Sequence, residues 1–247
     1  MKHKIGLNLI KNYSINFSLP KKPNRPIKFI IIHYTGMKKE SNAIKRLCEP
    51  KSKVSAHYFI KNNGDVINLV PDSYVAWHAG KSSWQNYKSL NEYSIGIEIN
   101  NPGHDHRYKN FTLMQISSLI KLIRSLSKKY GVKKRNILGH SDIAPNRKKD
   151  PGEKFPWKKL AKKQLGIWHN LDEKKIKLLR GNKISFLQEK MFLKNLYKIG
   201  YCKIKNKNFK KDKEYMVKAF QRHFRQELIN GKIDVECLLI SKNITKA

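Results

Sequence analysis

An unbroken apolar run, IKFIIIHY at residues 27–34, constrains the fold of this chain more than any other segment. Its consecutive isoleucines are β-branched, and a strand with this pattern is typically buried on both faces. Such a strand needs packed layers on either side of its sheet. The run also carries His33 to the end of a buried strand, where an imidazole can project into a cleft.

Other segments predict a mixed sheet with helices packed against it. Four of them predict strands: AHYFI (56–60), DVINLV (65–70), SIGIEIN (94–100) and NILGH (136–140). The first two flank Asn63-Gly64, a turn signal that predicts a β-hairpin. A short helix is predicted over 41–50, with a capping residue at its start and a proline at its end. Strands alternating with helices favour an α/β (α+β) domain with a mixed central sheet flanked by helices.

The clearest helix is predicted to follow Thr112. Thr112 and Gln115 form a capping-box pattern, apolar residues then recur at helical spacing, and Gly131 suits the C-terminal cap. Residues 1–26 are polar and contain three prolines, so we expect an extended lead-in to the first strand.

Beyond residue 172 the chain is lysine-rich and its apolar spacing is helical. The pattern predicts helices over 184–201, over 213–224 and from Asp234 to 240. A unit of about 70 residues is large enough to fold alone. We therefore expect two domains, 1–172 and a small C-terminal three-helix domain at 173–247.

The net charge of +35 comes from 53 Lys and Arg against 18 Asp and Glu, so the surface could bind polyanions by counterion release. The excess is spread along the whole chain, which favours a general lysine bias over one dedicated partner. No zinc-finger, RNP or Walker pattern accompanies it. Nucleic acid is therefore not the expected partner.

The sequence predicts no membrane-spanning segment, because its apolar runs are far shorter than the roughly 18 residues required. The basic N-terminus is interrupted before a signal-peptide core forms, and it has no lipobox cysteine. The chain as given is therefore expected in the cytoplasm, and export or processing would place it in the periplasm or cell envelope. Cys48, Cys202 and Cys237 are scattered, which favours neither a disulfide framework nor a cysteine metal site.

His33, His140 and Asp150 form the candidate metal centre. Each lies at the end of an apolar run or in a tight turn. Two imidazoles and one carboxylate are a ligand set that leaves the fourth zinc position open, which is typical of catalytic zinc. For each residue alone the alternative is structural, a buried histidine or an Asx turn. Their combination predicts a metal-dependent hydrolase with one Zn²⁺ per chain.

Glu98 and Lys148 are the candidate acid/base and oxyanion groups. Strand alternation places Glu98 on the opposite face from Ile95, Ile97 and Ile99, facing either solvent or a cleft. Burial in a cleft would raise the pKa of this carboxyl, which suits a general base; the alternative is a satisfied structural carboxylate. Lys148 could stabilise an oxyanion beside the metal, or be an ordinary surface lysine in a lysine-rich chain.

These segments together resemble the zinc-dependent N-acetylmuramoyl-L-alanine amidases of the AmpD and AmiD type, which are related in fold to phage T7 lysozyme and the peptidoglycan recognition proteins. The matching segments are IIIHYTG, SAHYFI, AWHAGKSSW, LNEYSIGIEIN, GHSDIAPNRKKDPGEKFPW and AFQRHFRQELINGKID, in order over roughly residues 27–235. The resemblance is closest to the AmiD-like branch, whose C-terminal helical module carries the FQxHFR pattern and looks like a peptidoglycan-binding domain.

The resemblance implies roles for individual residues. It implies zinc ligation by His33, His140 and Asp150, catalysis by Glu98, and oxyanion stabilisation by Lys148. The residues that it places against substrate are Trp77, His78, Ala79 and Asn100.

The implied activity is hydrolysis of the amide between the lactyl group of N-acetylmuramic acid, including its 1,6-anhydro form, and L-alanine. The substrate would be peptidoglycan or muropeptides in bacterial cell-wall turnover and degradation. The alternative is a non-catalytic peptidoglycan recognition protein, which would usually lack part of the metal set that is whole here. The sequence leaves open the oligomeric state and the preference between intact wall and anhydro-muropeptides.

Overall fold

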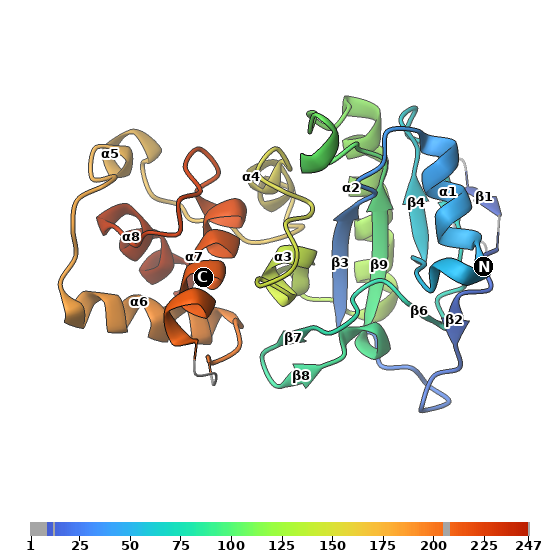
Figure 1. The fold of residues 1–247 in the computed structure, drawn as a ribbon, viewed down its shortest axis with the longest axis horizontal. Coiled ribbons are helices and arrows are strands. Elements are labelled where there is room, and N and C mark those ends of the chain that lie inside the picture. The colour runs from blue at the N-terminus through green and yellow to red at the C-terminus, as the bar shows by residue number, and fades with distance from the viewer. Residues whose placement is uncertain (1–8, 12, 205–207, 247) are drawn as a thin grey trace.

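The computed structural model describes residues 9–11, 13–204 and 208–246. Its centre is a six-stranded sheet in the order β1-β5-β4-β9-β3-β10 (Figure 1). The strands are β1 (Leu9–Lys11), β3 (Phe29–Tyr34), β4 (Tyr58–Ile60), β5 (Val66–Asn68), β9 (Ser94–Ile99) and β10 (Ile137–Gly139). β4 and β5 pair antiparallel as a hairpin, and the other neighbouring strands pair parallel. The predicted mixed sheet is thus confirmed.

Smaller elements complete the fold. Two two-stranded ribbons join β2 (Phe17–Ser18) to β6 (Val75–Ala76) and β7 (Ser83–Trp84) to β8 (Tyr87–Lys88). The helices are α1 (Glu40–Cys48), α2 (Leu113–Tyr130), α3 (His140–Ile143), α4 (Trp157–Lys162), α5 (Glu173–Lys177), α6 (Phe186–Ile199), α7 (Phe209–Phe224) and α8 (Val235–Ile244). Short 3-10 turns lie at Pro50–Ser52, Leu90–Tyr93, His104–His106 and Lys134–Asn136. Among the described residues, no helix is both long enough and apolar enough to cross a membrane.

β3 is buried on both faces, as its sequence predicts. Ile30 and Ile32 pack with the apolar face of α2, whereas Phe29 and Ile31 belong to a second cluster on the other side of the sheet. α2 has the predicted cap, because the Thr112 hydroxyl accepts from the Gln115 amide and the Gln115 side chain accepts from the Thr112 amide. Layers on both sides therefore hold the strand that carries His33.

Two sequence expectations change in detail. The lead-in contributes β1 at the sheet edge and β2 in a ribbon, because extended backbone finds strand partners there; residues 1–8 and 12 lie outside the described part. α1 begins at Glu40, one residue earlier than predicted, and its N-cap Lys39 makes no side-chain capping bond.

The C-terminal helices α6, α7 and α8 form beside the sheet-bearing segment (Figure 1). Asp234 caps α8 by accepting from the Cys237 amide, as predicted. The hydrophobic cluster that contains Phe29 and Ile31 also contains Phe192 of α6 and Phe220 of α7. The helices therefore share a core with the sheet. The boundary between 172 and 173 coincides with the N-terminus of α5 and stays a prediction.

Candidate metal centre and active site

Parallel pairing brings the candidate residues to one edge of the sheet. β3 pairs with β9 in a register that puts His33 beside Glu98, and His140 follows directly after β10, the other neighbour of β3. Because the carboxyl ends of parallel strands lie at the same edge, side chains at these ends converge. Asp150 reaches this edge from the loop that follows α3.

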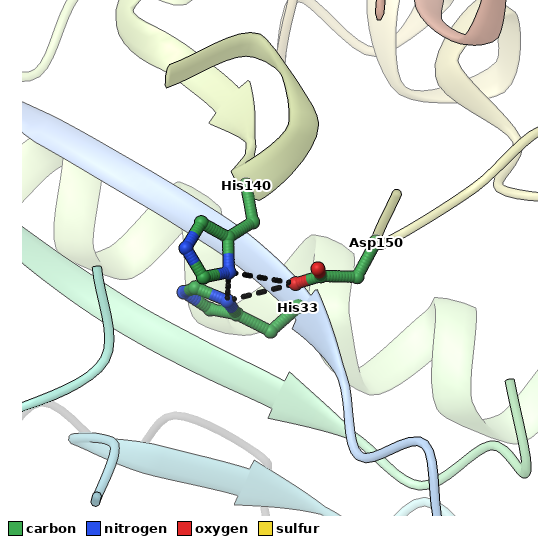
Figure 2. A group of neighbouring side chains, drawn as sticks. All are labelled: His33, His140 and Asp150. Atoms are coloured by element: carbon green, nitrogen blue, oxygen red, sulfur yellow. Dashed lines mark hydrogen bonds and ion pairs between the residues drawn. The ribbon is translucent and has the colours of Figure 1, made fainter. Parts of the chain in front are cut away.

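His33, His140 and Asp150 point their ligand atoms at one another (Figure 2). The Nδ1 atoms of the two histidines lie 2.9 Å apart, and each lies 3.0 Å from Oδ2 of Asp150. All three residues are buried. A tetrahedral ion with bonds of about 2.0–2.1 Å would hold such atoms about 3.3 Å apart. The cluster is therefore close to the spacing that a bound ion requires.

The outer nitrogens of both histidines have partners that fix the rings. His140 Nε2 donates to the carbonyl of Ala79 at 3.2 Å, and His33 Nε2 lies 3.0 Å from Nδ1 of His78. Because a carbonyl only accepts, this contact takes a hydrogen on Nε2 of His140, and in the neutral imidazole Nδ1 is then the nitrogen available to a metal ion. The donor set thus fits a metal ion, with the outer contacts typical of metal-bound histidines.

The protonation of the cluster also suits a metal ion. Burial, followed by the neighbouring His140, lowers the pKa of His33 to about 4, so this imidazole is neutral at pH 7. Burial alone would raise the pKa of Asp150, but His140 and His33 outweigh it and hold that pKa below its usual range. Neutral imidazoles and an ionised carboxylate are the forms that bind metals.

Glu98 lies beside this cluster with one oxygen unpaired. Its Oε2 is buried and has no hydrogen-bond partner among the described residues. Burial first, and the charge of Asp150 second, raise the pKa of Glu98 to about 8, while Lys148 lowers it. The side chain faces a cavity and not open solvent, which decides between the two alternatives that strand alternation left open. An unpaired carboxyl with a pKa near neutrality can exchange a proton with a bound molecule.

This raised pKa predicts the pH dependence of metal-free stability. An unfolded Glu98 has a pKa near 4.5, so between about 4.5 and about 8 the folded state keeps a proton that the unfolded state has lost. Stability then falls as the pH rises. We expect Glu98→Gln to gain stability over the wild type across this window, by at most about 1.4 kcal/mol per pH unit. Urea unfolding of both proteins in chelator measures this difference, and a difference independent of pH would contradict it.

A cavity of about 350 Å³ opens over the cluster. Phe59 of β4 pairs with Glu98 of β9, so their side chains lie on the same face of the sheet. Phe59 packs against Ala43 and Leu47, and α1 therefore covers this face next to the cluster. The cavity lies between this helix and the loop of Asp150. Its lining is His33, Thr35, Gly36, Met37, Ala43, Arg46, Leu47, Val54, Ser55, Trp77, His78, Glu98, His140, Lys148 and Asp150.

The residues predicted to contact substrate divide into two groups. Trp77 and His78 line the cavity, as does Lys148, the predicted oxyanion group. Ala79 is buried behind it, where its carbonyl accepts from His140 and from Arg147. Asn100 is also buried outside the lining, and its amide donates to Oδ1 of Asn62 at 2.9 Å. The predicted substrate roles of Ala79 and Asn100 thus have no support from the lining.

Sequence reasoning missed several residues around the centre. Arg46 of α1 contributes a cation to the cavity wall, which no motif indicates. His78, predicted only as a substrate contact, also supports His33, and its Nε2 lies 3.3 Å from the hydroxyl of Ser94. Gly96 leaves space for His78, because a Cβ at residue 96 would lie 2.3 Å from that ring. The glycine in SIGIEIN was the available signal for this close approach.

Comparison with known proteins agrees with this geometry. The sequence profile of N-acetylmuramoyl-L-alanine amidase, Amidase_2, matches residues 23–153. The N-acetylmuramoyl-L-alanine amidase AmiD of Escherichia coli is 34% identical over 228 residues, which cover 87% of this chain and 81% of AmiD. The 1,6-anhydro-N-acetylmuramyl-L-alanine amidase AmpD of E. coli is 41% identical over 105 residues, or 42% of this chain and 55% of AmpD.

Solved structures agree over the whole fold. E. coli AmiD, in complex with the substrate anhydro-N-acetylmuramic acid-L-Ala-D-gamma-Glu-L-Lys, has a TM-score of 0.77 at 33% identity and covers 90% of this chain and 89% of its own. AmpDh3 from Pseudomonas aeruginosa has a TM-score of 0.78 at 30% identity, with coverage of 92% and 93%.

A mixed sheet with a His-His-Asp cluster and an adjacent carboxyl group at its edge defines a hydrolase of the metal-dependent amidase class. Within that class, the chain belongs to the N-acetylmuramoyl-L-alanine amidase family.

Proposed function

We propose that this enzyme uses Zn²⁺ to hydrolyse the amide between the lactyl group of N-acetylmuramic acid and L-alanine in peptidoglycan fragments. His33, His140 and Asp150 would hold the ion. When bound there, zinc supplies a Lewis acid beside the scissile carbonyl. The substrate in the AmiD complex, an anhydro-muropeptide, supports the 1,6-anhydro form as one substrate. The observation that best supports this proposal is the unpaired Oε2 of Glu98 next to the cluster of His33, His140 and Asp150.

Glu98 is the proposed general base and acid. Its carboxylate would take the proton from the attacking water and then deliver it to the amine of L-alanine as the C–N bond breaks. A pKa near neutrality suits both directions of transfer, because neither the acid nor the base form is then scarce. The water oxygen becomes part of the lactyl carboxylate, so no covalent intermediate with the protein is needed.

Lys148 is the proposed oxyanion partner. Lys148 lines the cavity, and its positive charge lowers the pKa of both His33 and Glu98. The ammonium group is therefore close enough to act on the cluster electrostatically. An ammonium there would stabilise negative charge as the carbonyl carbon becomes tetrahedral. Trp77, which lines the cavity and is half-buried, would offer an apolar surface to the substrate.

The test is product analysis with and without a chelator. Incubation with a purified anhydro-muropeptide should release the free peptide with an L-alanine amino terminus and the anhydro-sugar, as identified by mass spectrometry. Chelator should abolish this cleavage and stoichiometric Zn²⁺ should restore it, because the reaction depends on the ion. A parallel digest of intact wall gives the substrate preference. Protein that binds both substrates after zinc loading but cleaves neither would instead be a non-catalytic recognition protein.

A further inference from the structure

The C-terminal helices reach the metal centre through a buried carboxylate, Asp142. This residue lies in α3, the short helix that begins with His140. Its carboxylate accepts from the Gly139 amide, from the Tyr201 hydroxyl and from Nδ1–H of His223, each at 2.8 Å. Asp142, Tyr201 and His223 are 2%, 3% and 2% exposed. We call these three residues the Asp142 clamp.

The two sides of the clamp come from separate parts of the sequence, with Asp142 near the middle of the chain and Tyr201 and His223 in its C-terminal part. Tyr201 follows the C-cap of α6, and His223 lies in the last turn of α7. Asp142 also accepts a hydrogen bond from the amide of Gly139, the residue immediately before His140. One carboxylate therefore ties the backbone next to a proposed metal ligand to the C-terminal helices.

Packing fixes both donors of the clamp. The His223 ring stacks on Trp157 at a centroid distance of 3.9 Å and on Phe224 at 4.0 Å. The Tyr201 ring packs edge-on against Trp84 at 4.8 Å. A buried carboxylate without its donors is costly, so α3 would have to shift to rehydrate Asp142 if they were lost.

The clamp also gives a role to the AFQRHFR motif. Its histidine is His223, which faces Asp142 and not solvent. Both aromatic residues that flank the middle of the motif, Phe220 and Phe224, are buried core residues. The motif is therefore explained by contacts inside the protein.

We propose that Tyr201 and His223 are positioning residues for His140. By holding Asp142 they fix the turn that directs Nδ1 of His140 toward His33 and Asp150. The inference rests on the proposed function only for the ligand role of His140. Ligand positions must be held to within about 0.5 Å for a productive site, so even a small shift of α3 would disturb the position of His140.

The experiment measures metal binding and not turnover. The main variant is Tyr201→Phe/His223→Phe, which keeps both rings and removes both donors. Competition with a chromophoric chelator gives the Zn²⁺ dissociation constant, and the visible spectrum of Co²⁺-loaded protein reports ligand geometry. We expect affinity to fall by about 10- to 100-fold, the usual cost of losing support around a ligand, together with a changed Co²⁺ spectrum. His223→Asn keeps an N–H near the position of Nδ1, so this variant should retain most of the Zn²⁺ affinity that the double variant loses.

A matched control is Ser241→Ala. This removes a buried hydroxyl that accepts from Asn195 between α6 and α8 and that makes no contact with the clamp. It should lower the melting temperature but leave Zn²⁺ affinity and the Co²⁺ spectrum unchanged. If the double variant does not fold, Tyr201→Phe alone serves, with a smaller loss expected.

Wild-type affinity and spectrum in the clamp variants would overturn the inference, as would equal changes in the Ser241→Ala control. Wild-type protein that binds Zn²⁺ but cleaves no muropeptide would contradict the proposed function, and the clamp measurements would still decide the positioning role. Wild-type protein that binds no Zn²⁺ would overturn both.

Discussion

Glu98→Gln is expected to keep its zinc and to lose turnover of a muropeptide by about 10³-fold. General acid–base groups contribute about 10²–10⁴-fold, and this carboxyl is asked to move a proton in both directions. The amide of glutamine is close in size, and Glu98 is not among the ligand atoms of the cluster, so metal binding should persist. Metal content by mass spectrometry, measured on the sample used for kcat, separates the two effects.

The matched control for this substitution is Glu214→Gln. Glu214 lies on the exposed side of α7, where it forms an ion pair with Lys218. Its loss should change neither zinc content nor kcat. Near-normal turnover in Glu98→Gln would remove this residue from the acid/base role, and loss of zinc would point to an unexpected place among the ligands.

His33→Ala is expected to lose both the metal and the activity. It removes one of the three proposed metal ligands and leaves only His140 and Asp150 to hold the ion. Bound metal supplies several kcal/mol of transition-state stabilisation, so turnover should approach background even with excess Zn²⁺. Equilibrium dialysis followed by metal analysis, with kcat on the same sample, measures both quantities.

His106→Ala is the matched control, since His106 is an exposed histidine of the 3-10 turn His104–His106 and is not part of the cluster. It should retain stoichiometric zinc and wild-type kcat. Full zinc occupancy in His33→Ala would show that the ion is held elsewhere.

Short-range patterns predicted the elements that position the site. The isoleucine run predicted β3, the capping box predicted α2, and Asn63-Gly64 predicted the hairpin of β4 and β5. These signals succeed because each is set by neighbouring residues and by burial of one element. His33, His140 and Asp150 were selected by residue type and context, and the structure brings their ligand atoms together.

Contacts between distant segments had no comparable signal. Arg46 of α1 lines the cavity together with residues far away in sequence, such as Lys148. The contact between His223 and Asp142 likewise joins distant parts of the chain. α3 is a single turn, and its Asp142 is held by Tyr201 and His223 from the C-terminal helices. Periodicity carries no information about such contacts, because they depend on where whole elements dock.

The geometry of the metal centre also restricts which residue can stand at position 96. Gly96 touches neither the ion nor the substrate, yet any larger residue would displace the His78 ring that supports His33. Selection should therefore act against any larger residue at this position. Sequence change in the middle of β9 would thus be limited by the imidazole of His78, which contacts a proposed metal ligand without being one.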